Sequence, residues 1–117
     1  MNTFRMILTR TGQPIATQAI IATTFRQRLQ GFLGRDRVAV GEAMIFPGCR
    51  SIHTVGMRCA IDAVFVDRSW RVVALRPHLV PGRVVPPVRG AWGTIEMASG
   101  TIERVKLQCS DQLTLES

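Results

Sequence analysis

Apolar residues recur along the chain in short runs that either alternate with polar positions or are apolar throughout. Turn-forming residues bound most of these runs, and runs of this length rich in Val, Ile and Phe are typical of β-strands. The pattern predicts strands at residues 4–10, 14–20, 42–46, 60–66, 70–76, 92–98 and 111–115. Residues 67–69 (DRS) separate two of these strands, and Asp67 is suited to hydrogen-bond its own turn backbone, so we expect a hairpin there.

The strongest helical pattern lies at residues 24–33. Thr24 and Gln27 have the spacing of a capping box, and Gly34 suits the left-handed position that ends a helix. Gly31 within the pattern costs about 1 kcal/mol relative to alanine, which indicates close packing or an earlier helix end. The apolar face of this one short α-helix would carry Phe25, Leu29, Phe32 and Leu33.

Residues 77–90 (PHLVPGRVVPPVRG) hold four of the six prolines, which predicts a long irregular loop. Residues 99–107 predict a turn or a single helical turn. Several short strands with one amphipathic helix favour a mainly β fold, a small and mostly antiparallel barrel or sandwich. With 117 residues, 46% of them hydrophobic, the chain fits a single domain over residues 1–117 that buries about two-thirds of its unfolded surface.

The distribution of apolar residues also bears on location. No stretch approaches the ~20 apolar residues of a membrane-spanning helix, so we expect no membrane insertion. Arg5 and Arg10 interrupt the N-terminal run and leave no signal-peptide core. Three cysteines without a repeated spacing fit reduced thiols. These features predict a cytoplasmic protein.

Arginine dominates the charge of the chain. Fourteen arginines and one lysine against eight acidic residues give a net charge of +7, and residues 26–89 alone carry eleven arginines and four acidic residues. This basic region is either a solvated surface or a binding site for a small anionic ligand or an acidic protein partner. Nucleic acid is less favoured, because tyrosine is absent and no basic cluster exceeds two adjacent charges. The donors that we expect are Arg50, His53, Arg58, Arg76 and His78.

Residues 49–59 (CRSIHTVGMRC) gather side chains that can bind zinc or copper. In an extended strand, however, Cys49 and His53 would lie ~13 Å apart, as would His53 and Met57, whereas zinc donors lie within ~4 Å of one another. Only a sharp bend at Gly56 would bring them together, so we expect no metal and no other cofactor. Cys49 and Cys59 are either packing residues or nucleophiles activated by a nearby base.

Two carboxylates interrupt strands that are otherwise apolar: Asp62 in AIDAVFV and Glu96 in WGTIEMA. A carboxylate in such a strand must be paired, hydrogen-bonded or facing solvent. The structural interpretation is a partner among arginines or backbone amides. The chemical interpretation is a general acid–base group, and His53, Asp62 and Glu96 are the candidate catalytic residues.

Six short motifs follow one another between about residues 24 and 115: RLQGFLGR, AMIF, CRSIHTVGM, AIDAVFVDRSWRVVAL, IEMASGT and SDQL. Their order and spacing resemble the domain of unknown function 192 family, also called uncharacterised protein family 0127. The resemblance implies a compact, mostly β, barrel-like domain with one short helix, and a family without an established activity. The residues that match the family pattern are Arg28, Gly31, Met57, Asp62, Glu96 and Gly100.

The core at His53, Thr54, Gly56 and Met57 resembles a His-Thr-x-Gly-Met branch of the family rather than its commoner Trp-Met form. Members similar to this branch often sit near genes for pilus or secretion machinery, which implies a bacterial accessory protein. The final strand departs from the family pattern, because Ser110-Asp111 stands where Gly-Asp is usual.

Two classes of function remain open. The first is a non-catalytic accessory domain that binds a small ligand or a partner, with Arg50, His53, Met57, Arg58, Asp62 and His78 as its binding residues. The second is a small enzyme that uses Asp62, Glu96 and His53 as acid–base groups, and it requires these side chains to converge in one pocket. We expect the binding module rather than the enzyme.

Overall fold

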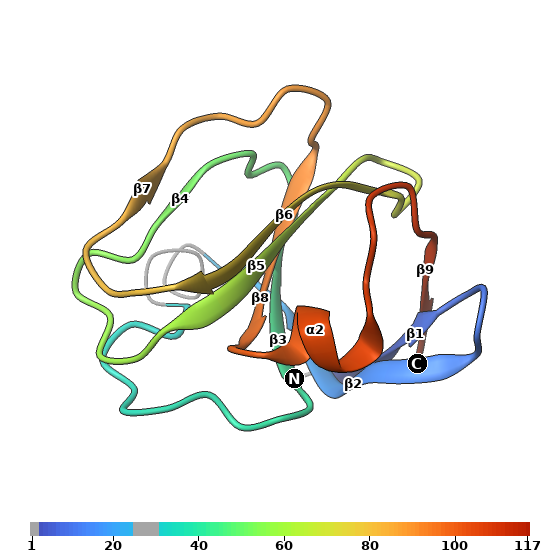
Figure 1. The fold of residues 1–117 in the computed structure, drawn as a ribbon, viewed down its shortest axis with the longest axis horizontal. Helices are drawn as coiled ribbons and strands as arrows, with labels where there is room; N and C mark the ends of the chain where they lie inside the picture. Colours follow the sequence, from blue (N-terminus) through green and yellow to red (C-terminus); the bar gives the residue numbers. More distant parts are fainter. Residues whose placement is uncertain (1–2, 25–30) are drawn as a thin grey trace.

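The structure, a computed structural model, describes residues 3–24 and 31–117. Within this part of the chain it contains nine strands and one short helix (Figure 1). Strands lie at every position where the apolar pattern predicts one, and the fold is mainly β as predicted. The elements are β1 (Thr3–Leu8), β2 (Gln13–Ile21), β3 (Glu42–Phe46), β4 (Ile52–His53), β5 (Ile61–Val66), β6 (Val72–Leu79), β7 (Val84–Val85), β8 (Gly93–Ala98), α2 (Thr101–Val105) and β9 (Leu113–Glu116).

Seven of these strands form one curled sheet in the order β6-β5-β8-β3-β2-β1-β9. Every pair is antiparallel except β2 and β3, which run parallel. The two ends of the sheet meet, because Arg71 forms a β-bridge with Gln112 and the Val72 amide donates a hydrogen bond of 2.8 Å to the Asp111 carbonyl. The sheet is therefore rolled into a barrel-like shape, as Figure 1 shows.

The inner face of the barrel holds the main hydrophobic core, which includes Met6, Ile45, Val64 and Ile95. Helix α2 packs Ile102 into this core. All six residues of β5 and of β8 are buried, because the outer face of these strands is covered as well. Burial on both faces explains why their sequences are almost continuously apolar, whereas a half-exposed strand alternates.

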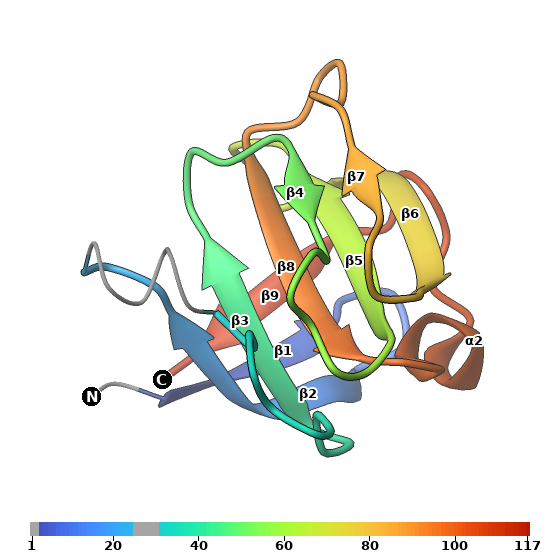
Figure 2. The ribbon, with the colours of Figure 1, turned by 90° about the vertical axis from the view of Figure 1, so that its left-hand side faces the viewer.

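The cover on the outer face is the two-stranded sheet of β4 and β7, which lies in front of β5 and β8 in Figure 2. Val85 of β7 packs against Ala63 and Phe65 of β5. A second outer cluster joins Phe32, Met57 and Ile61. The outer layer therefore brings residues 31–33, 49–57 and 79–91 onto one face of the sheet.

The hairpin predicted at residues 67–69 is confirmed. Asp67 Oδ1 accepts hydrogen bonds from the amides of Ser69 at 2.8 Å and Arg71 at 3.0 Å. These bonds close the turn between β5 and β6 as an aspartate at this position favours.

The prediction of one long loop over residues 77–90 is wrong in part. Strand β6 continues to Leu79, and Val84–Val85 pair with Ile52–His53 as β7 and β4. Pro77 is compatible with β6 because this strand is the end strand of its sheet, where a missing N–H is tolerated.

Most of the predicted helix at residues 24–33, including Arg28, lies outside the described residues. Residues 31–34 form a turn in which Phe32 is buried. The helix of the described part is α2, at the position where the sequence predicts a turn or one helical turn. No helix in residues 3–24 or 31–117 has the length and apolar character needed to cross a bilayer.

Candidate functional site: a pocket around Glu96

A pocket of about 120 Å³ lies on the outer face of the sheet, between the turn at residues 31–33, the end of β3, the segment 49–57 and β8. Its apolar walls are Phe32, Leu33, Phe46, Ile52 and Met57. The remaining lining residues are Gly31, Cys49, Ser51, His53 and Glu96. Two residues predicted from the sequence as acid–base candidates, His53 and Glu96, therefore line one cavity.

Strand β8 directs Glu96 to this outer face. Glu96 pairs with Met44 on one side and with Ala63 on the other, and side chains opposite one another share a face of the sheet. Its neighbours Ile95 and Met97 point instead into the barrel core. The alternation of strand β8 thus places a single carboxyl group among the apolar outer residues.

The Glu96 carboxyl is only 7% exposed, and no described residue forms a hydrogen bond or an ion pair with it. Burial disfavours the charged form and raises the pKa of Glu96 from 4.5 to about 7. The pocket therefore holds a carboxyl group that changes its protonation state near neutral pH.

Gly31 brings the chain close to this carboxyl. Its φ of +46° is in the left-handed region, and a Cβ atom here would lie 2.9 Å from Phe46 Cζ and 3.6 Å from Glu96 Oε1. Only glycine fits this approach without moving the phenylalanine ring. The glycine that matches the family pattern therefore has a physical role in shaping the pocket.

The segment 49–57 contributes its side chains by folding back instead of extending. Gly56 has a φ of +88°, and the Met57 amide donates to the Thr54 carbonyl at 3.0 Å. This turn buries Met57 in the pocket wall, while His53 lines the pocket from an exposed position. No group of three or more His, Cys, Asp or Glu side chains in the described ranges is arranged to hold a metal ion.

Asp62 is fully buried, but it lies on the opposite face of the sheet from Glu96. It pairs with Met97, whose side chain belongs to the barrel core. Its Oδ1 accepts from the His78 amide and its Oδ2 accepts from the Ile102 amide, each at 2.8 Å. Asp62 therefore joins β6 to the first turn of α2, and it does not line the Glu96 pocket.

The other predicted residues lie in separate places. His78 has a φ of +51°, and its Nδ1 is 2.7 Å from Ser99 Oγ. Arg58 forms an exposed ion pair with Asp36 at 3.2 Å. Arg50 is exposed, and Gly100, with a φ of +94°, precedes α2 as its N-cap residue. Arg76 and His78 line a second hollow, whereas Arg50, His53 and Arg58 do not line it, so the five donors expected from the sequence do not share one site.

Several pocket residues were not predicted as site residues from the sequence. Phe32, Phe46 and Ile52 are ordinary core residues by type, and Cys49 was interpreted as packing or nucleophilic without a location. No signal in a single sequence distinguishes an apolar residue that lines a cavity from one that fills a core.

Comparisons with known proteins agree with the fold. The family model DUF192, described as "Uncharacterized ACR, COG1430", matches residues 6–115. A UPF0127 protein from Thermococcus sibiricus is 30% identical over 116 residues, which cover 95% of this chain and 75% of that protein. A crystal structure of a "putative transcription regulator" from Sinorhizobium meliloti 1021 superposes with a TM-score of 0.80 at 19% identity, covering 96% of this chain and 91% of that one. A protein of unknown function from Novosphingobium aromaticivorans superposes with a TM-score of 0.79 at 19% identity, covering 96% and 83% of the two chains.

Proposed function

Since the chain belongs to the DUF192 family, which is described only as uncharacterized, we propose its function from the pocket itself: a non-catalytic binding module that holds a small molecule against Glu96. The observation that carries the proposal is the Glu96 carboxyl group, which is 7% exposed, lines the pocket and forms no hydrogen bond or ion pair with a described residue. A carboxyl group with little access to water loses part of its hydration, and a ligand in the pocket that donates a hydrogen bond to it would offset this cost.

The pocket limits the size and chemistry of the ligand. Its volume of about 120 Å³ is comparable with the cavity of ~150 Å³ that holds one benzene ring in other proteins. The aromatic and aliphatic walls favour an apolar body, and Glu96 favours an N–H or O–H donor on it. An ionised Glu96 repels a carboxylate or phosphate, so the small anionic ligand suggested by the arginines is not proposed for this pocket.

Phenol and aniline are suitable probes, with benzene as the control that lacks a donor. In a ¹H–¹⁵N NMR titration we expect phenol and aniline to shift the amides of residues 31–33, 49–57 and 96 and to bind more tightly than benzene. The preference should be lost in Glu96→Leu, which removes the acceptor from a side chain of similar size. It should also strengthen between about pH 6 and pH 8 as the carboxyl ionises.

Equal binding of phenol and benzene, or equal binding by the wild type and Glu96→Leu, would contradict the proposal. Failure of both donor probes to shift any pocket amide at millimolar concentration would contradict it as well. Circular dichroism and the melting temperature of each variant establish that the barrel is folded before the titrations are compared.

A second proposal, acid–base catalysis, is supported by the pKa of Glu96 near 7 and by His53 and Cys49 on the same pocket wall. Asp62 is not part of it, because both of its oxygens accept backbone hydrogen bonds on the other face. Phenyl acetate tests this alternative. Hydrolysis that the wild type accelerates and Glu96→Gln does not would favour catalysis over binding alone.

From the family resemblance alone we also propose a cytoplasmic, accessory role beside pilus or secretion machinery. Cell fractionation followed by immunodetection tests the location, and recovery of the protein in the envelope fraction would contradict it.

A further inference from the structure

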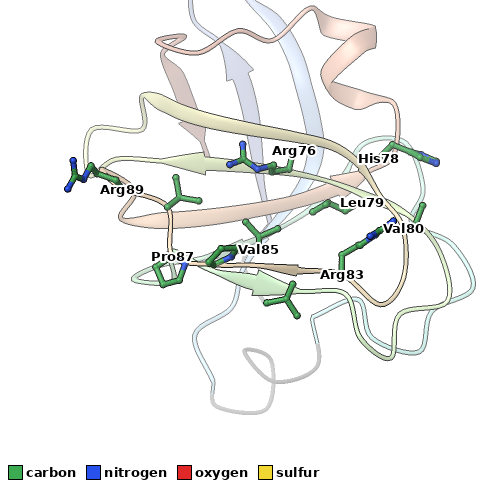
Figure 3. Close-up of a pocket in the computed structure, with 11 residues that line it drawn as sticks. Arg76, His78, Leu79, Val80, Arg83, Val85, Pro87 and Arg89 are labelled. Carbon is green, nitrogen blue, oxygen red and sulfur yellow. The ribbon is translucent and has the colours of Figure 1, made fainter.

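A second hollow, separate from the Glu96 pocket, lies between β6 and β7 on the outer face (Figure 3). It is an open groove of about 570 Å³, which we call the arginine groove, and it is lined by residues of the segment 76–89. Its floor is apolar, because Leu79, Val85 and Val88 belong to the outer hydrophobic cluster beneath it. Val84, which also lines the groove, is 70% exposed, a large fraction for a valine.

Three arginines, Arg76, Arg83 and Arg89, stand around this floor, and none of the lining residues is acidic. Among the described residues, no carboxylate forms an ion pair with any of the three, whereas Arg5, Arg10, Arg35 and Arg58 each have a carboxylate partner. The charge of the groove is therefore not neutralised by the protein itself.

Figure 3 shows Arg89 at one end of the groove, Arg83 at the other, and Arg76 between them. Because the guanidinium groups do not converge on one point, a single small anion cannot contact all of them. An elongated ligand with several carboxylates can do so. Its uncharged parts would then rest on the apolar floor.

The groove is also held in shape before a partner arrives. The Thr54 amide donates to the Arg83 carbonyl at 2.8 Å, and Thr54 Oγ1 accepts from the Arg83 amide at 2.8 Å. Thr54 Oγ1 in turn donates to the Val80 carbonyl at 2.7 Å. A preformed groove lowers the entropy lost on binding, which favours recognition of an otherwise flexible peptide.

We propose that the arginine groove binds an extended acidic segment of a partner protein, with carboxylates of the segment on Arg76, Arg83 and Arg89 and its apolar side chains on Leu79, Val85 and Val88. The inference is independent of the proposed small-molecule site, because the groove and the Glu96 pocket share no lining residue.

Fluorescence anisotropy with a labelled DVDVDV peptide tests the proposal, and KVKVKV is the control peptide of opposite charge. We expect DVDVDV to bind, KVKVKV not to bind, and the affinity to fall when the salt is raised to about 0.5 M. Arg83→Ser and Arg89→Ser should each weaken binding by about twofold to fivefold. Arg37→Ser, which removes an exposed arginine outside the groove, should leave it unchanged.

The exposed position 84 accommodates two charged variants of opposite sign. Val84→Glu should weaken binding of DVDVDV, and Val84→Lys should tighten it. Equal losses in Arg83→Ser and Arg37→Ser, or binding of KVKVKV as tight as that of DVDVDV, would overturn the proposal. The proposal would also be overturned if a single-stranded oligonucleotide displaced the labelled peptide at a lower concentration than the unlabelled peptide does. That result would favour a nucleic acid as the ligand of the groove. Glu96→Leu should not change peptide binding, so the two proposals fail separately.

Discussion

The Glu96 pocket and the arginine groove lie against the same two-stranded sheet, but they use charge in opposite ways. Ile52 and His53 of strand β4 line the pocket, and Val84 and Val85 of β7 line the groove. His53 and Val84 are paired in register, so the two sites are one strand apart. The pocket encloses one carboxyl group, whereas the groove exposes three guanidinium groups.

The difference shows that the effect of a charged group on binding and stability depends on how exposed the group is. Water screens each exposed arginine, so a single ion pair there contributes only about 0–1 kcal/mol and several charges are needed for a useful affinity. In the pocket, burial raises the pKa of Glu96 to about 7. Replacing this one side chain therefore changes the charge of the whole pocket. We therefore expect substitutions in the pocket to have larger effects than substitutions in the groove.

The largest expected effect is that of Glu96→Gln on the pH dependence of stability. The pKa of Glu96 is raised from 4.5 to about 7, so the folded state binds its proton more tightly than the unfolded state does. Below about pH 4.5 the carboxyl is protonated in both states and does not change the free energy of unfolding. As the pH rises from about 4.5 to about 7, stability falls, because the unfolded state releases this proton before the folded state does. The loss amounts to about 3 kcal/mol at pH 8, since each pKa unit corresponds to about 1.4 kcal/mol.

Glutamine remains neutral, so Glu96→Gln should be the more stable protein at pH 8 and should lose the advantage near pH 5. Urea unfolding of both proteins across this range measures the difference. Among the described residues, the other titratable groups that line the pocket are His53 and Cys49, and both proteins retain them, so the comparison isolates Glu96. If the free energies of unfolding of the two proteins changed with pH in parallel, burial would not control the pKa of the Glu96 carboxyl.

Asp62→Asn has the next largest expected effect and the opposite sign. Both oxygens of Asp62 accept backbone amides at 2.8 Å, and an asparagine replaces one acceptor by an NH₂ group that faces a donor. We expect a loss of about 2 kcal/mol in the free energy of unfolding, because a buried hydrogen bond is broken and its donor is left unpaired. Asp67→Asn is the control, since both of its hydrogen bonds use Oδ1, which asparagine retains. Equal losses in the two variants, measured by urea unfolding, would contradict the assigned role of Asp62.

Asp62 and Glu96 also show how much of the site the sequence alone predicts. Both interrupt an apolar strand, and this pattern identifies each as a residue that needs an explanation. The sequence does not say which face each occupies. Register decides it: Asp62 pairs with Met97, and Glu96 with Ala63, so a difference of one position sends them to opposite faces. Asp62 then accepts hydrogen bonds from backbone amides, and Glu96 lines a cavity.

The fold was predictable where local patterns determine it. Strands β5 and β8 follow from their apolar runs, and the Asp67 turn follows from its side chain. Strand β7 was missed because its pairing with β4 joins Val85 to Ile52, residues far apart in the sequence, in a region dominated by proline. The parallel pairing of β2 and β3 has no local signature either.

The smallest expected difference between a variant and its control concerns Gly31, the glycine that borders the pocket. Alanine at Gly31 adopts a φ of +46° with a cost of about 1–2 kcal/mol, as at any left-handed position, and its methyl group meets Phe46 Cζ at 2.9 Å. Gly34, at a φ of +80° with no atom within 4 Å of an added Cβ, is the matched control for backbone strain alone. We expect Gly31→Ala to be less stable than Gly34→Ala by about 1 kcal/mol, since the phenylalanine ring must move. It should also weaken phenol binding, because the methyl group points toward Glu96 Oε1 at 3.6 Å. Equal melting temperatures and equal phenol affinities for the two variants would mean that the turn at residues 31–34 does not shape the pocket.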